Sequence, residues 1–438
     1  MESKMVKPSF YNIFLSKENG GAVFNARTGK MLRYFDGDAH IIENYLKQEY
    51  LAWSGENHYM AVMYKNGLLV DFDLDEIGEM EQREQDGSFG DCLRLILLPT
   101  EQCNFRCVYC YEKFERGRMS ETTQDAIVEY IQENINRYKG LIVNWFGGEP
   151  TEAMDIIENL SLRLIEVCKK NKKAYNAGIT TNGYNLTLEN FKKLKKFHVT
   201  EYQITIDGLE NIHNAQRMMS DGSPTFDVIM KNLLAIKSNI KSSAITIVLR
   251  TNFSKKMLEH TNEFCELLDK YISDDKRFKL YWQLISDYGY VKNEETRNIF
   301  GDYKDYKWLI ENFTDRFLND LTRTLYGPDG GTCYALKRNQ ILVDANGGIR
   351  KCTCALEDEE NFFGTIGKEF DEIKHEEWLR SRLINKDSKC YLCKKRPLCH
   401  NRQCYKAQNC LIDYQYFDVI LNKMADKEQF YEVIDGRN

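Results

Sequence analysis

The chain has 438 residues, of which 42% are hydrophobic, and its formal net charge is −6. A chain of this length exceeds what one hydrophobic core serves, so about two or three domains are expected. The acidic balance argues against generic nucleic-acid binding, and no apolar run reaches the roughly eighteen residues that span a membrane. Residues 1–8 lack the apolar stretch of a secretion signal, which predicts a cytoplasmic protein.

The first part of the chain predicts a small α+β module, similar to a winged helix, over residues 1–88. Strands are expected at residues 11–15, 22–24, 31–34 and 67–71, with a turn at 26–29. Asp38 is placed to cap a helix that continues through Lys47. The acidic segment 79–88 is interpreted as a linker.

Residues 89–300 alternate short apolar segments with helical patterns, which is typical of β-α units and a parallel sheet. The expected strands are 93–98, 142–146, 178–181, 202–206, 244–250 and 279–285, and the expected helices are 121–138, 154–170, 188–196, 226–239 and 256–271. The fold class is therefore α/β, with a partial (β/α)6 barrel of the TIM type. Reactive groups then belong at the carboxyl ends of its strands. A bridging helix at 302–326, within residues 301–332, leads to a cysteine-rich region at 333–438 that ends in a helix.

The fourteen cysteines are not expected to form disulfides in a reducing cytoplasm, so their clustering is informative. Eight lie in the C-terminal region, and three follow the first predicted strand as Cys103, Cys107 and Cys110. Three thiolates on one loop ligate three corners of a four-iron cluster and leave the last iron open. A zinc site with a distant fourth ligand is the alternative. Cys92, Cys168 and Cys265 are scattered and are predicted to be small buried residues.

This loop resembles the radical SAM superfamily, in which the open iron chelates the amino and carboxylate groups of S-adenosylmethionine (SAM). The resemblance implies that Tyr109 packs near the adenine of the cofactor. The second predicted strand is followed by Gly147, Gly148, Glu149 and Pro150, which match the family motif that grips the SAM amino group. Thr181 and Asn182, after the third, resemble a cofactor-contacting turn, although an ordinary loop would look the same.

The segment 205–226 resembles a stretch of the peptide-modifying radical SAM subgroup. There the resemblance implies that Arg217 binds the SAM carboxylate, for which a planar guanidinium is suited. His213 is interpreted as a structural residue rather than a base. Asn214 replaces the aspartate common at its position, which leaves its role open. The sequence assigns no general base.

The C-terminal cysteines resemble a SPASM domain, the extension that carries auxiliary clusters in peptide maturases. The resemblance implies one cluster on Cys333, Cys352 and Cys404 and a second on Cys390, Cys393, Cys399 and Cys410. With the SAM-binding cluster this makes three [4Fe-4S] clusters. Four residues rather than three separate Cys399 from Cys404, and Cys354 is extra, so exchange among Cys354, Cys404 and Cys410 stays open. Zinc ribbons are the alternative.

The resemblance implies an enzyme in which SAM yields a 5′-deoxyadenosyl radical. The N-terminal module loosely resembles the leader-recognition element of peptide maturases, which adds an extended leader to a sheet edge. The sequence thus predicts a cytoplasmic maturase that forms a thioether in a precursor peptide, with flavodoxin or ferredoxin as electron donor and no membrane or nucleic-acid partner. The alternatives are an anaerobic sulfatase-maturating enzyme and a carbon–carbon crosslinking cyclase. Against the sulfatase alternative, Thr353 stands where those enzymes carry an aspartate.

Overall fold

The computed structural model describes residues 4–434, apart from 88–90, 273, 286–293, 301–303, 306–307, 309–310, 312–332, 382–385 and 399–413. The chain divides into two compact units. The first comprises Met1–Gly87, Ile310–Cys333 and Arg382–Asn438, and the second comprises Ser88–Leu309 and Tyr334–Ser381. The C-terminal cysteine region therefore contributes to both units.

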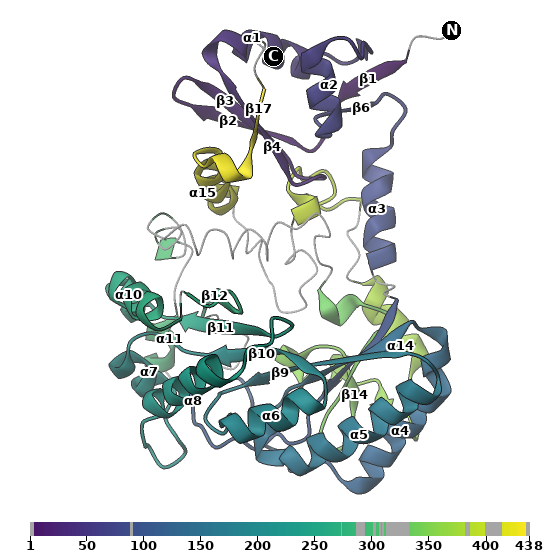
Figure 1. Ribbon diagram of the computed structural model, residues 1–438. Coiled ribbons are helices and arrows are strands. Elements are labelled where there is room, and N and C mark those ends of the chain that lie inside the picture. The colour runs from purple at the N-terminus through teal and green to yellow at the C-terminus, as the bar shows by residue number, and fades with distance from the viewer. Residues whose placement is uncertain are drawn as a thin grey trace. The chain divides into compact units, whose positions relative to one another are not determined.

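The first unit contains two small sheets and the helices that cover them (Figure 1). One sheet has the order β17-β4-β3-β2, and the other has the order β5-β1-β6. The strands are β1 Met5–Pro8, β2 Asn12–Lys17, β3 Gly20–Asn25, β4 Lys30–Phe35, β5 Leu51–Ala52, β6 Leu69–Asp71 and β17 Glu432–Val433, and the helices are α1 Asp36–Lys47, α2 His58–Lys65, α3 Glu76–Gly87 and α15 Tyr414–Ala425. The α+β character predicted for this module is confirmed.

The C-terminal segment completes the core of the first unit. β17 pairs in parallel with β4, and the Ile434 backbone N–H donates to the Arg33 carbonyl at 3.0 Å. The Ile434 side chain is fully buried in the same cluster as Val23, Leu32 and Met63. Residues at opposite ends of the chain thus share one hydrophobic core.

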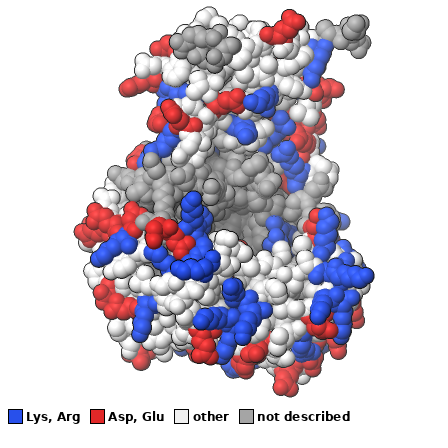
Figure 2. All heavy atoms as spheres, in the orientation of Figure 1, with Lys and Arg blue, Asp and Glu red and all other residues white. Residues whose placement is uncertain are grey.

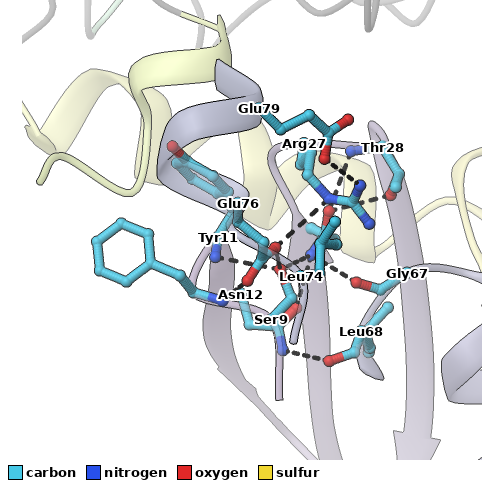
Figure 3. A network of polar contacts seen from close by, with 12 residues as sticks. Ser9, Tyr11, Asn12, Arg27, Thr28, Gly67, Leu68, Leu74, Glu76 and Glu79 are labelled. Atoms are coloured by element: carbon cyan, nitrogen blue, oxygen red, sulfur yellow. Dashed lines mark hydrogen bonds and ion pairs between the residues drawn. The ribbon is translucent and has the colours of Figure 1, made fainter. Parts of the chain in front are cut away.

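The segment interpreted as a linker is helical, which corrects that prediction. Helix α3 spans Glu76–Gly87 and holds the intrahelical pair Glu79–Arg83 at 2.6 Å. Its carboxylates also reach the strands, because Glu76 accepts from the Phe10 backbone at 2.7 Å and Glu79 pairs with Arg27 at 3.0 Å (Figure 3). The charges that indicated a linker are therefore structural contacts.

Asp38 does not cap helix α1, which corrects a second prediction. The helix begins two residues earlier, at Asp36, and its N-cap Phe35 makes no side-chain capping hydrogen bond. Asp36 and Asp38 both lie in the first turn, where negative charge interacts favourably with the helix dipole. Asp38 also accepts a hydrogen bond from the Tyr59 hydroxyl at 2.6 Å.

The second unit is built on an eight-stranded sheet of order β12-β11-β10-β9-β8-β7-β13-β14. Its strands are β7 Cys92–Leu97, β8 Gly140–Trp145, β9 Ala174–Thr181, β10 Val199–Thr205, β11 Thr246–Phe253, β12 Phe278–Leu284, β13 Gln340–Val343 and β14 Ile349–Arg350. Strands β7 to β12 are all parallel and follow chain order. This confirms the α/β fold class and the six predicted strands.

Helices cover this sheet, with α4, α5, α6 and α8 along one side of it in Figure 1. They are α4 Glu121–Asn134, α5 Met154–Lys170, α6 Leu188–Lys196, α7 Glu210–Gln216, α8 Phe226–Asn239, α9 Lys255–Leu258, α10 Thr261–Ile272, α11 Glu294–Ile299 and α14 Glu372–Arg380. The predicted helix at 256–271 is split into α9 and α10. Short 3-10 turns occupy Ile135–Arg137, Pro150–Ala153, Tyr334–Leu336, Thr353–Ala355, Glu359–Asn361, Arg396–Leu398 and Glu428–Phe430, and β15 Gly364–Thr365 pairs with β16 Glu369–Phe370.

Some sequence predictions fall outside the described residues. Most of the bridging helix expected at 302–326 is among them, and so are Cys399, Cys404 and Cys410. Of the three scattered cysteines, Cys168 is buried as predicted, whereas Cys92 and Cys265 are partly exposed. Positive and negative side chains are interspersed on the face shown in Figure 2.

Candidate functional site

A pocket lies in the second unit where the parallel strands end. It opens to solvent, and Cys103, Cys107 and Cys110 line it together. The loops after β8 and β9 also contribute, as do polar side chains on β10, β11 and β12. The structure thus brings the three loop cysteines to the edge of the sheet where a parallel fold places reactive groups.

Two glycines let the loop after β8 pack against the cysteine loop. The Glu149 backbone N–H donates to the Gln102 carbonyl at 2.9 Å, and that of Gly148 donates to Thr100 at 3.3 Å. A Cβ atom on Gly148 would lie 2.4 Å from the Gln102 carbonyl oxygen. Gly147 has a φ of +115°, which side chains disfavour. The Gly147–Gly148 pair is therefore required by backbone packing, whatever the pocket binds.

Glu149 lies behind the pocket wall and is fully buried. Its carboxylate accepts from the Thr151 N–H at 3.0 Å and hydroxyl at 2.6 Å, from the Thr181 hydroxyl at 2.6 Å, and from the Asn182 N–H at 2.6 Å. Burial raises its pKa, against these hydrogen bonds. Gly147, Gly148, Thr181 and Asn182 line the pocket, whereas Glu149 and Pro150 do not. Glu149 therefore ties the loops after β8 and β9 together.

The surroundings of Cys103 suit a metal-bound sulfur. The Phe105 backbone N–H lies 3.3 Å from its Sγ, and the Asn182 amide nitrogen lies 4.0 Å from it. Such N–H groups stabilise cluster thiolates and tune cluster potentials. Burial raises the pKa of the Cys103 thiol well above its usual range, and metal binding would remove that proton. Three thiols on one pocket wall are a donor set that fits an iron–sulfur cluster.

Tyr109 and Arg217 form a buried polar network beside these thiols. Arg217 donates to the Tyr109 hydroxyl at 2.8 Å, Asn252 donates to it at 3.1 Å, and the hydroxyl also contacts the Asp207 carboxylate. Burial raises the pKa of Tyr109 well above its usual range. The Arg217 Nε atom is buried and has no hydrogen-bond partner among the described residues. The guanidinium of Arg217 thus offers the pocket one hydrogen-bond donor that no described residue uses.

His213 has a structural position, as interpreted from the sequence. Its Nδ1 accepts from the Asp207 N–H at 3.1 Å, and its Nε2 lies 3.2 Å from the Thr225 hydroxyl, which itself donates to the Arg217 carbonyl. Both ring nitrogens are satisfied in the neutral state, and burial holds the pKa of His213 well below its ordinary value. Asn214 accepts from the Thr225 and Phe226 N–H groups at the start of α8.

Sequence reasoning missed several pocket residues. Glu112 lines the pocket, and burial raises its pKa to about 8. Arg250, Asn252 and Gln283 also line it, from β11 and β12. Polar residues at the carboxyl ends of parallel strands are the signal that would have found the last three. Glu112 would have required attention to the residues just after Cys110.

The C-terminal cysteines are divided between the units. Cys352 is buried in the second unit, where Asn361 accepts from its N–H at 3.0 Å and fixes the following turn. A hydrogen bond from Cys352 lowers the pKa of Cys354 to about 6. Cys390 and Cys393 lie in the first unit, where the Cys393 N–H donates to the Cys390 carbonyl at 3.2 Å. Cys333 also belongs to the first unit.

The parallel sheet and its thiol-lined pocket define a class of protein. Residues 97–265 match the radical SAM superfamily, so the chain contains a radical SAM domain. That domain implies SAM and one [4Fe-4S] cluster as cofactors, and the expectation of a radical SAM enzyme is confirmed at this level. Among the described helices, none is sufficiently long and apolar to cross a membrane.

The chain is similar to two curated proteins and to one solved structure described below. A cysteine-type anaerobic sulfatase-maturating enzyme of Clostridium novyi is 23% identical over 341 residues, covering 70% of this chain and 87% of that protein. An uncharacterized protein of Methanocaldococcus jannaschii, MJ0907, is 29% identical over 178 residues, and the match spans 57% of its length. A solved structure of anSMEcpe with bound AdoMet and Kp18Cys peptide shares the fold, with a TM-score of 0.59 at 20% identity over 76% of this chain and 96% of that chain.

Proposed function

We propose that this protein modifies a ribosomally made precursor peptide by joining a cysteine sulfur to a carbon atom. The observation that carries the proposal is the pocket. It is lined by three loop thiols and by Arg217, whose buried Nε atom has no hydrogen-bond partner among the described residues. When bound, the cluster and SAM supply a radical that removes hydrogen from an unactivated carbon. The protein's part is to orient that carbon and keep water out.

In this proposal Cys103, Cys107 and Cys110 hold the SAM-binding cluster, and Arg217 pairs with the SAM carboxylate. Gly147 and Gly148 bring the backbone close to the amino group. Tyr109, Thr181 and Asn182 line the same pocket and complete the contact surface. Glu149 and Pro150 are proposed to support the pocket loop from outside the pocket, because Glu149 is fully buried and holds the loop by hydrogen bonds.

Auxiliary clusters are part of the same proposal, because the radical takes only one of the two hydrogen atoms lost when the carbon–sulfur bond forms. An auxiliary cluster would accept the remaining electron, and the thiol proton would leave to solvent. Cys333, Cys352 and Cys404 are proposed for one, and Cys390, Cys393, Cys399 and Cys410 for the other. The acidic thiol of Cys354 keeps it as a competing ligand, because a low pKa favours the thiolate that binds metal. Anaerobic reconstitution should give about twelve irons per chain for three four-iron clusters.

We also propose that the N-terminal module binds the leader of the precursor along β2. The edge of β4 is covered by the short strand β17, and β2 is the outer strand on the other side of this sheet among the described residues. The two-residue turn Glu18–Asn19 is flanked by the pair Lys17–Gly20, whose backbone groups face each other. Because inward-facing and outward-facing residues alternate along an antiparallel edge strand, the backbone N–H and C=O groups of Phe14 and Ser16 point away from β3. A leader would add there as a further strand.

Formylglycine formation is the second candidate, favoured by the long match to the Clostridium novyi enzyme. Thr353 argues against it, because its hydroxyl is hydrogen-bonded to Tyr334 at 2.7 Å and does not titrate as an aspartate does. The test is anaerobic turnover of a cysteine-containing precursor encoded beside the gene. A thioether lowers the peptide mass by two hydrogen atoms and consumes a thiol, whereas formylglycine converts a cysteine to an aldehyde. Absence of both products with active SAM cleavage would contradict both candidates.

A further inference from the structure

Arg250 brings a second guanidinium to the pocket wall, in addition to that of Arg217. It lies on β11, two residues before Asn252, so both side chains point to the same face of the sheet. Its Nε atom donates to the Asn252 side-chain oxygen at 2.8 Å. On the neighbouring strand β12 its partner is Tyr281, whose ring centroid lies 5.7 Å from the guanidinium carbon. The position of this cation is therefore set by contacts within the sheet.

The two guanidinium groups belong to one chain of hydrogen bonds. The Asn252 amide donates to the Tyr109 hydroxyl at 3.1 Å, and Arg217 donates to the same hydroxyl at 2.8 Å. Arg250 is thus linked to this hydroxyl through Asn252, whereas Arg217 contacts it directly. In the proposed function Arg217 pairs with the carboxylate of SAM, and SAM has one carboxylate. The pairing leaves Arg250 for a different ligand.

The charges that line the pocket favour an anionic ligand. Among the described residues, Arg217, Arg250 and Glu112 are the charged ones that line it. A guanidinium stays protonated, so the lining is net positive whether the Glu112 carboxyl is ionised or neutral. SAM adds an ammonium and a sulfonium against its single carboxylate. An iron–sulfur cluster on the loop thiols would offset part of this charge, on the side where Arg217 interacts favourably with Cys107.

An arginine held in this way is suited to a carboxylate. Its planar group presents paired N–H donors that match the two oxygens of a carboxylate. Tyr281 and Asn252 position the guanidinium before a ligand arrives, so little side-chain freedom is lost on binding. Gln283, the β12 neighbour of Asn252, also lines the pocket. A positioned guanidinium and a neighbouring amide thus form one polar wall on the carboxyl-terminal halves of β11 and β12.

We propose that Arg250 recognises a carboxylate of the substrate. This inference rests on the proposed function, since it takes the substrate to be a peptide. The carboxylate comes either from an aspartate or glutamate near the modified residue or from the C-terminus of the peptide, and the experiment distinguishes these sources. Arg250 is then a specificity residue for the peptide, whereas Arg217 serves SAM.

The enzyme arm of the test compares Arg250→Gln and Arg250→Lys with the wild-type enzyme on the same precursor. Loss of the charge-assisted contact in Arg250→Gln should raise the KM for the peptide about ten- to hundredfold, while the SAM dissociation constant and the iron content stay unchanged. Arg250→Lys keeps the charge but loses the paired donors, so an intermediate KM is expected. Arg137→Gln, exposed on the turn before β8, is the matched control.

The peptide arm uses the wild-type enzyme, so it does not depend on the folding of a variant. Each aspartate or glutamate of the core peptide is replaced in turn by its amide, and a further peptide has an amidated C-terminus. One change should reproduce the KM effect, and that peptide should lose little more with Arg250→Gln. If the wild-type enzyme modifies the precursor but every change is neutral, or if Arg250→Gln weakens SAM binding instead of peptide binding, the inference is wrong. If the wild-type enzyme leaves the precursor unmodified, the proposed function fails and this inference fails with it.

Discussion

Glu149 could contact SAM directly or support the loop after β8, and the sequence does not distinguish these two roles. Substitution of Glu149 does. Its carboxylate is the acceptor for two buried backbone N–H groups, those of Thr151 and Asn182. Hydrogen bonds to charged groups contribute about 1.5–3 kcal/mol each, so Glu149→Ala should lower the free energy of unfolding by about 3–6 kcal/mol. The two threonine hydroxyls can rotate to other acceptors and are left out of this sum. In Glu149→Gln the amide oxygen retains part of the contacts, and about half of the loss is expected.

The assay is thermal unfolding of the anaerobically reconstituted protein, with iron content and SAM affinity measured on the same samples. For a unit of this size each kcal/mol lowers Tm by about 2–4 °C, so Glu149→Ala should lose at least about 6 °C. Glu158→Gln, exposed on α5, controls for the loss of a surface charge. A variant with wild-type Tm, wild-type iron and weakened SAM binding would refute the supporting role and show that Glu149 contacts the cofactor.

Three further predictions concern the loop thiols, the outer edge of β2 and His213. Replacing Cys103, Cys107 and Cys110 by alanine should remove one cluster's iron and all 5′-deoxyadenosine formation, and continued SAM cleavage would contradict the assignment of these thiols. Ser16→Pro should weaken leader binding at least tenfold by titration calorimetry with Ser16→Ala unaffected, because proline removes an outward N–H from the proposed docking edge. Below pH 6.5 the unfolded chain binds a proton at His213 that the folded chain excludes, so the free energy of unfolding should fall by about 1.4 kcal/mol per pH unit from this group. His213→Gln should flatten that dependence, and an unchanged slope would show that His213 titrates freely.

The sheet was predictable because its signal is local and repeated. Each parallel strand is a short apolar run followed by an amphipathic helix, and the sheet order follows chain order. The positions of Cys103 and Gly148 followed from the same rule, since loops after neighbouring parallel strands meet at one edge. Helix α3 was missed because its acidic residues were interpreted as the sign of a linker. Their partners, such as the Phe10 backbone, are far away in the sequence.

The role of Glu149 was beyond sequence reasoning for a related reason. A carboxylate in a motif that grips an ammonium group looks like a direct ligand, and only the three-dimensional arrangement shows four protein donors already around it. Glu112 is the converse case. Nothing in its neighbours along the chain shows that its Oε2 atom is buried and lacks a hydrogen-bond partner among the described residues, because that depends on how segments around Glu101 and Cys354 pack near it.

The N-terminal and C-terminal segments share the hydrophobic core of the first unit, and this limits how leader recognition can be tested. Deletion of residues 1–88 treats them as a separable domain, but Ile434 is buried in the cluster that holds Val23 and Leu32. Arg396 is likewise buried and pairs with Glu84 of α3 at 2.9 Å. Removing the N-terminal segment would expose Ile434 and leave a buried guanidinium without its carboxylate, and breaking such a pair costs about 3–5 kcal/mol. Loss of activity in the deletion variant would therefore have two explanations. One is loss of the leader site, and the other is misfolding of the segment around Cys390 and Cys393. A single substitution on the outer edge of β2 leaves this core intact, so its effect on peptide binding can be assigned to the edge itself.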